Sequence, residues 1–262
     1  MTIIQSFILG LVEGLTEFLP ISSTAHLIIS SELLKITNSE FLKSFNISIQ
    51  LGAILSVVVL YWRRVWSNLG IIWKLAAAFI PTSILGLIFY KIVKNYLMES
   101  LLIIAISLLL GGIIIIIFEN WYAKKNLKED DSCDLDLNKI SYKQAIILGA
   151  VQAMAIIPGI SRSGATIIGG LAQGIKRKAI VEFSFLLAIP TMFAATVLDI
   201  YKNLAVFTGD QITVWLVGFI TSFITAIIGV KFLIKYVQKN DFKAFGWYRI
   251  ILGIIILGVL FL

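Results

Sequence analysis

Two segments of this chain place ionisable and hydroxyl side chains in otherwise apolar surroundings. Residues 10–26 hold two carboxylates, a Ser-Ser-Thr run and the only histidine, whereas residues 149–166 hold an arginine between two serines. The second segment matches the first at an offset of 139, and the aligned pairs are Gly10 with Gly149, Glu13 with Gln152, Ser22 with Ser161 and Ser23 with Arg162. One copy therefore carries acids and an imidazole, and the other carries a cation.

Arg162 is the candidate phosphate ligand. It stands between Ser161 and Ser163, just after a Pro-Gly pair, where a half-helix is expected to begin. Free N–H groups at a helix start, hydroxyl donors and a planar guanidinium together suit a phosphate group. The alternative is a structural arginine that ties the segment to backbone carbonyls, although a cation inside a membrane is functional by default.

Glu13 and Glu17 are four residues apart and are expected on one face of a helix. Two adjacent carboxylates repel each other unless a cation, a proton or Arg162 lies between them. The pair is therefore a candidate divalent-metal site or a general acid and base. The alternative is a carboxyl group that only neutralises Arg162.

His26 follows Ser23 by three residues, so one helical turn returns the imidazole over the Ser-Ser-Thr run. This spacing favours Ser23 as a nucleophile with His26 as its base and Glu17 orienting the imidazole or holding a metal. Two alternatives remain: His26 as the nucleophile with Glu17 as the acid, or attack by metal-bound water at the two glutamates. A structural histidine is the plainest alternative. Ser22 and Thr24 are favoured as helix caps over catalysts, and both are also candidate phosphate-binding residues.

Composition indicates the elements that must position these residues. With 59% apolar and 14% charged residues and a mean hydropathy of +0.96, the 262-residue chain is expected to be an all-α polytopic membrane protein. Six apolar segments are about long enough to be transmembrane helices, namely 44–62, 72–92, 101–118, 180–200, 211–234 and 247–262.

The two motif regions, 3–34 and 144–175, are apolar but interrupted by Pro-Ile-Ser-Ser-Thr and Pro-Gly-Ile-Ser-Arg-Ser. Proline ends the preceding helix and the hydroxyl residues cap a new one, so each region is expected to form a re-entrant helical hairpin.

The internal repeat predicts a single membrane domain, 1–262, built of two halves. Residues 79–91 match residues 219–231 at an offset of 140, which extends the repeat beyond the motifs. One hairpin and three spans per half make an inverted repeat of residues 1–118 and 144–262, joined by a charged cytoplasmic linker, 119–143.

Charge predicts orientation and partners. With Arg162 set aside, sixteen lysines and arginines fall on one side of the predicted spans and five on the other. The richer side is expected to be cytoplasmic, which leaves both termini and the 91–100 loop outside. The net charge of +7 needs no nucleic-acid partner, and the single cysteine, Cys133, cannot form an internal disulfide.

Residues 13–26 and 158–166 resemble the two signature regions of the undecaprenyl pyrophosphate phosphatases of the bacitracin-resistance type. Residues 49–54, 61–64 and 182–188 are also similar to that family, so the resemblance covers nearly the whole chain. It implies a multi-pass hydrolase of the bacterial plasma (inner) membrane that takes the terminal phosphate from a polyprenyl diphosphate, undecaprenyl diphosphate, recycles the lipid carrier for peptidoglycan synthesis and confers resistance to bacitracin.

The resemblance also implies a set of site residues. The implied catalytic set is Glu17, Ser23, His26 and Arg162, and the implied supporting residues are Glu13, Ser161, Ser163 and Thr166. It suggests dependence on a divalent cation, Mg or Ca. Membrane lipid is the expected surrounding, and a homodimer is left open.

A second class of function explains part of the pattern. An inverted-repeat transporter or lipid-carrier flippase accounts for broken helices, but it gives no reason for Ser-x-x-His beside an arginine. The phosphatidic acid phosphatase design needs two histidines, and this chain has one. Phosphate release from a lipid diphosphate in detergent, without a gradient, distinguishes the two classes.

Overall fold

The computed structural model describes residues 1–66, 68–92, 100–125, 137–203 and 209–261, and within these ranges the regular elements are all helical. The helices, in chain order, are α1 (Ile3–Thr16), α2 (Ser23–Leu33), α3 (Glu40–Trp66), α4 (Leu69–Ile92), α5 (Leu101–Lys125), η2 (Leu137–Lys139), α6 (Tyr142–Gln152), η3 (Ala153–Ile156), α7 (Arg162–Ala172), α8 (Arg177–Lys202), α9 (Gly209–Val237) and α10 (Lys243–Phe261).

Six of the described helices are long and apolar enough to cross a membrane. They are Glu40–Val65, Leu69–Phe89, Leu101–Lys125, Arg177–Lys202, Gln211–Val237 and Lys243–Phe261. Each overlaps one of the six segments predicted from hydropathy, which confirms the all-helical, membrane-type fold. Residue 262, the end of the last predicted segment, lies outside the described residues.

Both motif regions form helix–turn–helix pairs. In the first, α1 ends at Thr16 and α2 begins at Ser23. In the second, α6 and η3 end at Ile156 and α7 begins at Arg162. The interruptions predicted at Pro20 and Pro158 are therefore present, because a proline cannot donate the backbone hydrogen bond that would continue the helix.

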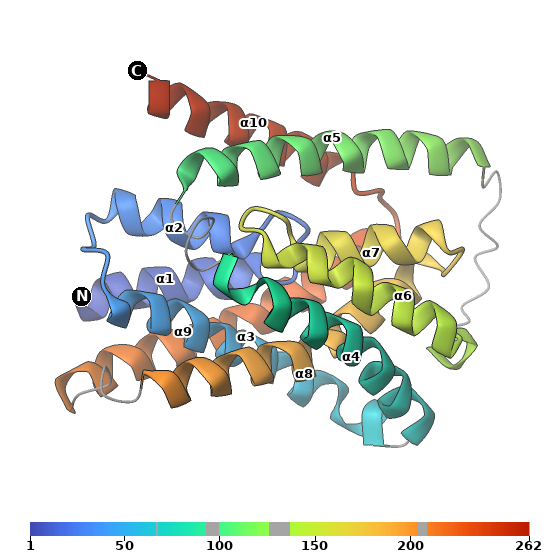
Figure 1. The fold of residues 1–262 in the computed structure, drawn as a ribbon, viewed down its shortest axis with the longest axis horizontal. Helices are drawn as coiled ribbons and strands as arrows, with labels where there is room; N and C mark the ends of the chain where they lie inside the picture. Colours follow the sequence, from blue (N-terminus) through green and yellow to red (C-terminus); the bar gives the residue numbers. More distant parts are fainter. Residues whose placement is uncertain (67, 93–99, 126–136, 204–208, 262) are drawn as a thin grey trace.

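The two helix pairs are built by matching contacts. Each begins with a capping box, Thr2 with Gln5 in α1 and Ser141 with Gln144 in α6. The amide Nε2 of Gln5 donates across the first pair to the carbonyl oxygen of Leu34 at 3.1 Å, and that of Gln144 donates to Gln173 at 3.3 Å. Figure 1 shows that the open ends of the pairs lie at opposite ends of the molecule and that their turns meet between them.

Glycines allow the first helix of each pair, α1 or α6, to pack closely against a long helix. A Cβ on Gly10 would overlap the backbone oxygen of Gly218 in α9, and a Cβ on Gly149 would overlap that of Ala78 in α4. Small residues let helix backbones approach each other this closely. The first helix pair therefore packs against α9 through α1, and the second packs against α4 through α6.

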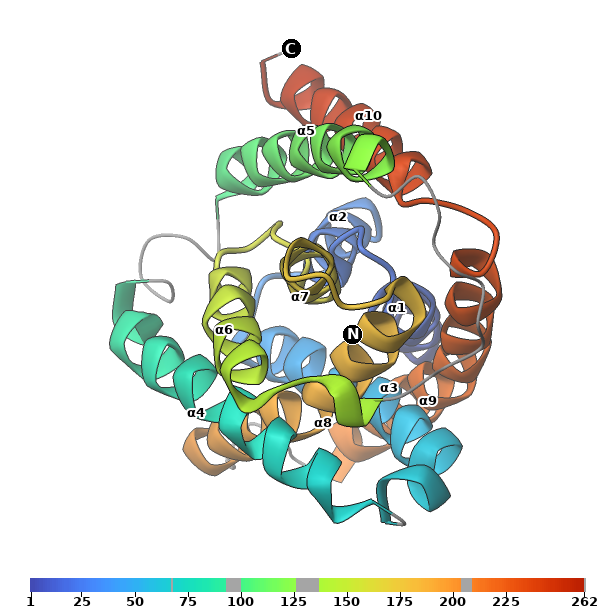
Figure 2. The ribbon, with the colours of Figure 1, turned by 90° about the vertical axis from the view of Figure 1, so that its right-hand side faces the viewer.

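Helices α5 and α10 pack along each other and form a separate layer over the helix pairs (Figures 1 and 2). The layer rests on α2 through a cluster of buried apolar residues, Ala25, Ile104, Ala105, Leu108 and Ile256. This packing brings residues from the end of the chain to the turns of both pairs.

The predicted linker, 119–143, begins inside α5 and includes η2 and the start of α6. Its residues 126–136, and with them Cys133, lie outside the described residues, as do residues 93–99 of the predicted outer loop. The boundaries of the two repeats stay predictions.

Candidate active site

The first turn is shaped by Ser22. Its backbone has φ 71°, in the left-handed region that residues other than glycine adopt rarely. Its hydroxyl accepts a hydrogen bond from the backbone N–H of Ala25 at 3.4 Å, so Ser22 caps α2 as predicted. The neighbouring Ser23 is therefore the first residue of the helix, with its hydroxyl at the turn.

The second turn places Arg162 at the start of α7. Ser161 caps this helix by accepting a bond from the backbone N–H of Gly164 at 3.1 Å. Gly159, three residues before the arginine, has φ 92° and lies against Ile104 of α5, where a Cβ would not fit. The predicted half-helix start and its serine cap are both present.

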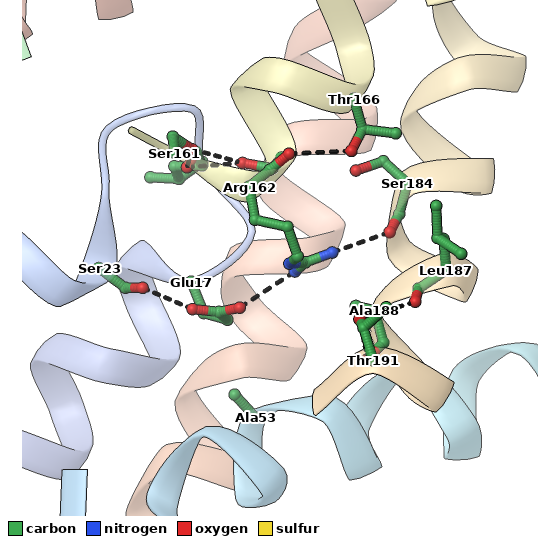
Figure 3. Close-up of polar contacts among 12 residues, drawn as sticks. Glu17, Ser23, Ala53, Ser161, Arg162, Thr166, Ser184, Leu187, Ala188 and Thr191 are labelled. Atoms are coloured by element: carbon green, nitrogen blue, oxygen red, sulfur yellow. Dashed lines mark hydrogen bonds and ion pairs between the residues drawn. The ribbon is translucent and has the colours of Figure 1, made fainter. Parts of the chain in front are cut away.

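Glu17, Ser23 and Arg162 come together where the two turns meet (Figure 3). The hydroxyl of Ser23 donates to Oε2 of Glu17 at 2.5 Å, and Nη2 of Arg162 donates to Oε1 of the same carboxylate at 3.0 Å. One carboxylate thus links a hydroxyl on its own helix pair to the cation of the other pair. Glu17 is 6% exposed and Ser23 7%, so this cluster is closed to bulk solvent.

Arg162 is held by α8 as well. Its Nη1 donates to the backbone oxygen of Ser184 at 2.9 Å, while its Nε is buried and has no partner among the described residues. The Nε–H group has no partner among the described residues, and Nη2 is bonded to the Glu17 carboxylate, which an anion could displace. Such a guanidinium is suited to bind an anion. Ser184 lies in the predicted span 180–200, where residue type alone gave no signal of this contact.

The hydroxyl residues of the second motif join the two turns. Ser161 and Ser163 lie 3.3 and 2.9 Å from the carbonyl oxygen of Leu19 in the first turn, and their hydroxyls are 3.0 Å apart. Thr166 donates to the backbone oxygen of Arg162 at 2.9 Å (Figure 3). In this state, all three hydroxyl groups are engaged in holding the site together.

Glu13 is fully buried, and neither carboxylate oxygen has a hydrogen-bond partner among the described residues. Gln152, its aligned residue, is satisfied: its amide lies 3.4 Å from the hydroxyl oxygens of both Thr82 and Thr166. A carboxyl group without a hydrogen bond or an opposite charge is costly to bury in the charged form. Glu13 therefore requires either a proton or a cation beside it.

Both ring nitrogens of His26 have partners other than Ser23. Its Nδ1 lies 2.7 Å from the carbonyl oxygen of Ser22, and its Nε2 lies 2.7 Å from the hydroxyl of Tyr248 in α10, whose ring stacks on the imidazole at 5.6 Å. A carbonyl oxygen only accepts, so Nδ1 carries the proton, and in the neutral ring Nε2 accepts from Tyr248. The imidazole returns to the cap as expected, but the hydroxyl of Ser23 is bonded to Glu17. The prediction of Thr24 as a helix cap was wrong, because Thr24 lies within α2 and its side chain makes no hydrogen bond to the described residues.

The site also contains residues that sequence reasoning missed. Tyr248 and Arg249 lie near the start of the predicted span 247–262, where aromatic and basic residues are typical of a membrane surface, yet Arg249 is only 2% exposed and bonds to both turns. Only the packing of α10 over the helix pairs brings these two residues to the site.

The donor set fits a divalent cation in part. Glu13 and Glu17 lie one helical turn apart, and the hydroxyl of Ser23 is bonded to the second carboxylate. The described residues contain no cluster of three or more acidic, histidine or cysteine side chains suited to a metal. Magnesium is commonly held by one or two carboxylates together with substrate phosphates, so these residues suit an ion that arrives with its ligand.

Comparison with known proteins identifies the family. Residues 6–255 match the model of the family described as bacitracin resistance protein BacA. Three similar proteins are named undecaprenyl-diphosphatase. That of Aquifex aeolicus (strain VF5) is 48% identical over 97% of this chain and 97% of its own length. That of Wolinella succinogenes is 49% identical over 98% of both, and that of Flavobacterium psychrophilum is 45% identical over 100% of this chain and 97% of its own length. The chain belongs to the bacitracin resistance protein BacA family.

Proposed function

We propose that this chain is an undecaprenyl-diphosphatase, which hydrolyses undecaprenyl diphosphate to undecaprenyl phosphate and inorganic phosphate. Relatives of that name align with it from end to end. The observation that carries the proposal is the cluster of Ser23, Glu17 and Arg162, in which a nucleophile, a proton acceptor and a phosphate ligand meet from two turns. This reaction recycles the lipid carrier for peptidoglycan synthesis and accounts for resistance to bacitracin.

In the proposed reaction, the terminal phosphate displaces Glu17 from part of the Arg162 guanidinium and also takes its free Nε. The oxygen of Ser23 attacks the terminal phosphorus, its proton passes to Oε2 of Glu17, and the bond to the bridging oxygen breaks. Undecaprenyl phosphate leaves, and water then cleaves the phosphoserine to release phosphate and restore Ser23. The 2.5 Å bond from Ser23 to Glu17 supports this route for the proton.

His26 has a different place in this proposal. Because Nδ1 is bonded to Ser22 and Nε2 to Tyr248, the ring is fixed in one tautomer beside the turn. We assign to His26 the role of second proton acceptor, for the water that cleaves the phosphoserine, and this role requires Nε2 to release the hydroxyl of Tyr248. Proton transfer from Ser23 directly to His26 stays a prediction that needs the imidazole to turn from Tyr248.

Glu13 and Glu17 are the residues that would hold a divalent cation, Mg or Ca. When bound, the cation would neutralise charge on the diphosphate oxygens. The two oxygens of Glu13, which have no hydrogen-bond partner among the described residues, support this assignment because a bound cation would offset the cost of burying the charged carboxylate.

We further propose that the six long helices span the bacterial plasma membrane and that the two helix pairs are re-entrant hairpins of an inverted repeat. The opposed open ends of the pairs and the matching bonds of Gln5 and Gln144 support this arrangement. The excess of cations on one side supports an orientation with both termini outside. Both ends of the chain lie toward the same end of the molecule in Figure 1.

The decisive experiment is phosphate release by purified protein in detergent, with undecaprenyl diphosphate and no gradient. We expect turnover in the wild type and a loss of at least about a hundredfold in Ser23→Ala. The matched control is Ser31→Ala, which removes a buried hydroxyl from the same helix and should keep normal turnover. A folded wild type that releases no phosphate with Mg or Ca present would overturn the proposal and favour a transporter.

A further inference from the structure

Arg249 is a buried cation whose partners in the described structure are carbonyl oxygens. Its side chain donates to four of them: Leu108 at 3.5 Å, Pro20 at 3.2 Å, Ser107 at 3.0 Å and Gly159 at 2.9 Å. None of the ion pairs found in the described part of the chain includes it. A guanidinium offers five N–H donors in a fixed plane, and this geometry is what lets one side chain reach several carbonyls at once.

The four carbonyls belong to three different parts of the fold. Ser107 and Leu108 lie in α5, Pro20 lies in the first turn and Gly159 lies in the second. Arg249 thus connects the α5–α10 layer to both turns at the same point. Burying a charge in this way costs free energy, and an arginine on the surface of α10 would avoid that cost. The burial of Arg249 is therefore best explained by the backbone segments that its side chain connects.

The anchored carbonyls flank the proposed catalytic groups. Pro20 lies between Glu17 and Ser23 in the chain, and Gly159 precedes Arg162 by three residues. A shift of either turn would therefore change the distance between the Ser23 oxygen and the guanidinium that binds the phosphate. The hydroxyls of Ser161 and Ser163, at the start of α7, also bind the carbonyl oxygen of Leu19, but neither contact reaches α5 or α10.

Tyr248, the residue next to Arg249, also contacts the active-site region. Tyr248 bonds to the imidazole of His26 at 2.7 Å, so two consecutive residues of α10 contact the first turn and the start of α2. A helix that only closed the fold would need neither contact. The start of α10 therefore has the contacts expected of a support for the active site.

We propose that Arg249 is a positioning residue for phosphate hydrolysis: it sets the spacing of the two turns, and thereby of Ser23 and Arg162, by binding Pro20 and Gly159 together. This inference rests on the proposed function. It differs from a general structural role because it requires the rate of the chemical step, and not only stability, to depend on Arg249.

The test compares Arg249→Lys with Arg177→Lys. Lysine keeps the charge but cannot bind both turns and α5 with one nitrogen. Arg177 is the matched control, because it is also a mostly buried arginine but pairs with Glu119 at the far end of α5. We expect Arg249→Lys to lower kcat about a hundredfold, with KM changed less than about threefold, since a misplacement of about 1 Å costs this much. The control should lose thermal stability and keep kcat within about threefold of the wild type.

A second variant displaces the guanidinium without removing it. A Cβ at Gly111 of α5 would overlap Nη2 of Arg249, whereas one at Gly258 of α10 would meet no atom within 4 Å. We expect Gly111→Ala to lower kcat at least about tenfold and Gly258→Ala to leave it unchanged. This pair decides the question if Arg249→Lys does not fold.

Hydrogen exchange supplies a measurement that does not depend on activity. Faster deuterium uptake in residues 17–22 and 157–161 is expected in Arg249→Lys and Gly111→Ala, but not in the two controls. Unchanged kcat in a folded Arg249→Lys or Gly111→Ala, or unchanged uptake in both turns, overturns the proposal. If the wild type itself releases no phosphate, the proposed function fails, and the exchange measurement still determines whether Arg249 holds the turns.

Discussion

Replacing Arg162 by lysine tests whether the guanidinium binds phosphate or only anchors the turn. In the structure, Nη1 is used by the Ser184 oxygen at 2.9 Å, Nη2 by Glu17 at 3.0 Å, and Nε is free. An ammonium group keeps the charge, but its single nitrogen cannot hold α8 and also present two donors to a phosphate.

The expected cost follows from the N–H donors that a lysine cannot supply to the phosphate. Removing one preorganised donor from a water-poor site costs about 3–4 kcal/mol of transition-state stabilisation, and each 1.36 kcal/mol is about a factor of ten in rate. We therefore expect kcat/KM for undecaprenyl diphosphate to fall by about 100- to 1,000-fold in Arg162→Lys. The ion pair with Glu17 can be kept by the lysine, so the protein should still fold.

The assay is phosphate release in detergent, with the folded fraction measured by size-exclusion chromatography. Arg64→Lys is the matched control, because Arg64 also joins two long helices through a carboxylate, Glu182, at 2.8 Å. It should retain activity within about threefold, because the Arg64–Glu182 pair is not part of the Glu17–Ser23–Arg162 cluster. Near-normal turnover of a well-folded Arg162→Lys protein would refute phosphate binding and leave Arg162 as an anchor.

Four further outcomes are expected. Rapid acid quenching during turnover should trap an acid-stable phosphate on Ser23, whereas an acid-labile adduct on His26 would reverse the assignment of the nucleophile, and the absence of any adduct in a slow variant would favour direct attack by water. After treatment with EDTA, Glu13→Gln should need at least about tenfold more Mg for half-maximal activity, and an unchanged Mg titration would remove Glu13 from the metal site. Tyr248→Phe keeps the stacked ring but removes the bond to Nε2 of His26, so kcat should fall about tenfold, and full activity would show that the hydroxyl is dispensable. On intact cells, a membrane-impermeant thiol reagent should not label Cys133, and labelling from outside would invert the predicted topology.

Hydropathy predicted the six long helices, and two of the four prolines marked the interruptions of the motif regions, whereas Pro81 and Pro190 lie inside α4 and α8. All six long helices overlap the predicted spans, because a bilayer-length apolar run has few alternatives to a helix. Pro20 and Pro158 marked both interruptions, and the serine before each half-helix is its cap in both cases. These features are local, so they can be inferred from a few adjacent residues.

Contacts between distant segments could not be predicted in the same way. The internal repeat indicated that Arg162 lies near the acidic residues, and the structure pairs it with Glu17. The spacing of Ser23 and His26 suggested that these two residues contact each other, but the structure pairs Ser23 with Glu17 and His26 with Tyr248. Tyr248 lies 222 residues from His26 along the chain. Its position depends on how α10 packs over α2, which no sequence period encodes.

The burial of the cluster has a consequence for the timing of catalysis. Glu17 and Ser23 are 6% and 7% exposed, and the α5–α10 layer rests on α2 through apolar contacts. With Ser23 as the proposed nucleophile, we expect each turnover to include an opening before the lipid enters and another before phosphate leaves. Bond cleavage then depends on how well the closed state aligns the turns, whereas the overall rate depends on how often that state is broken. A more stable closed state would favour bond cleavage and slow the overall rate.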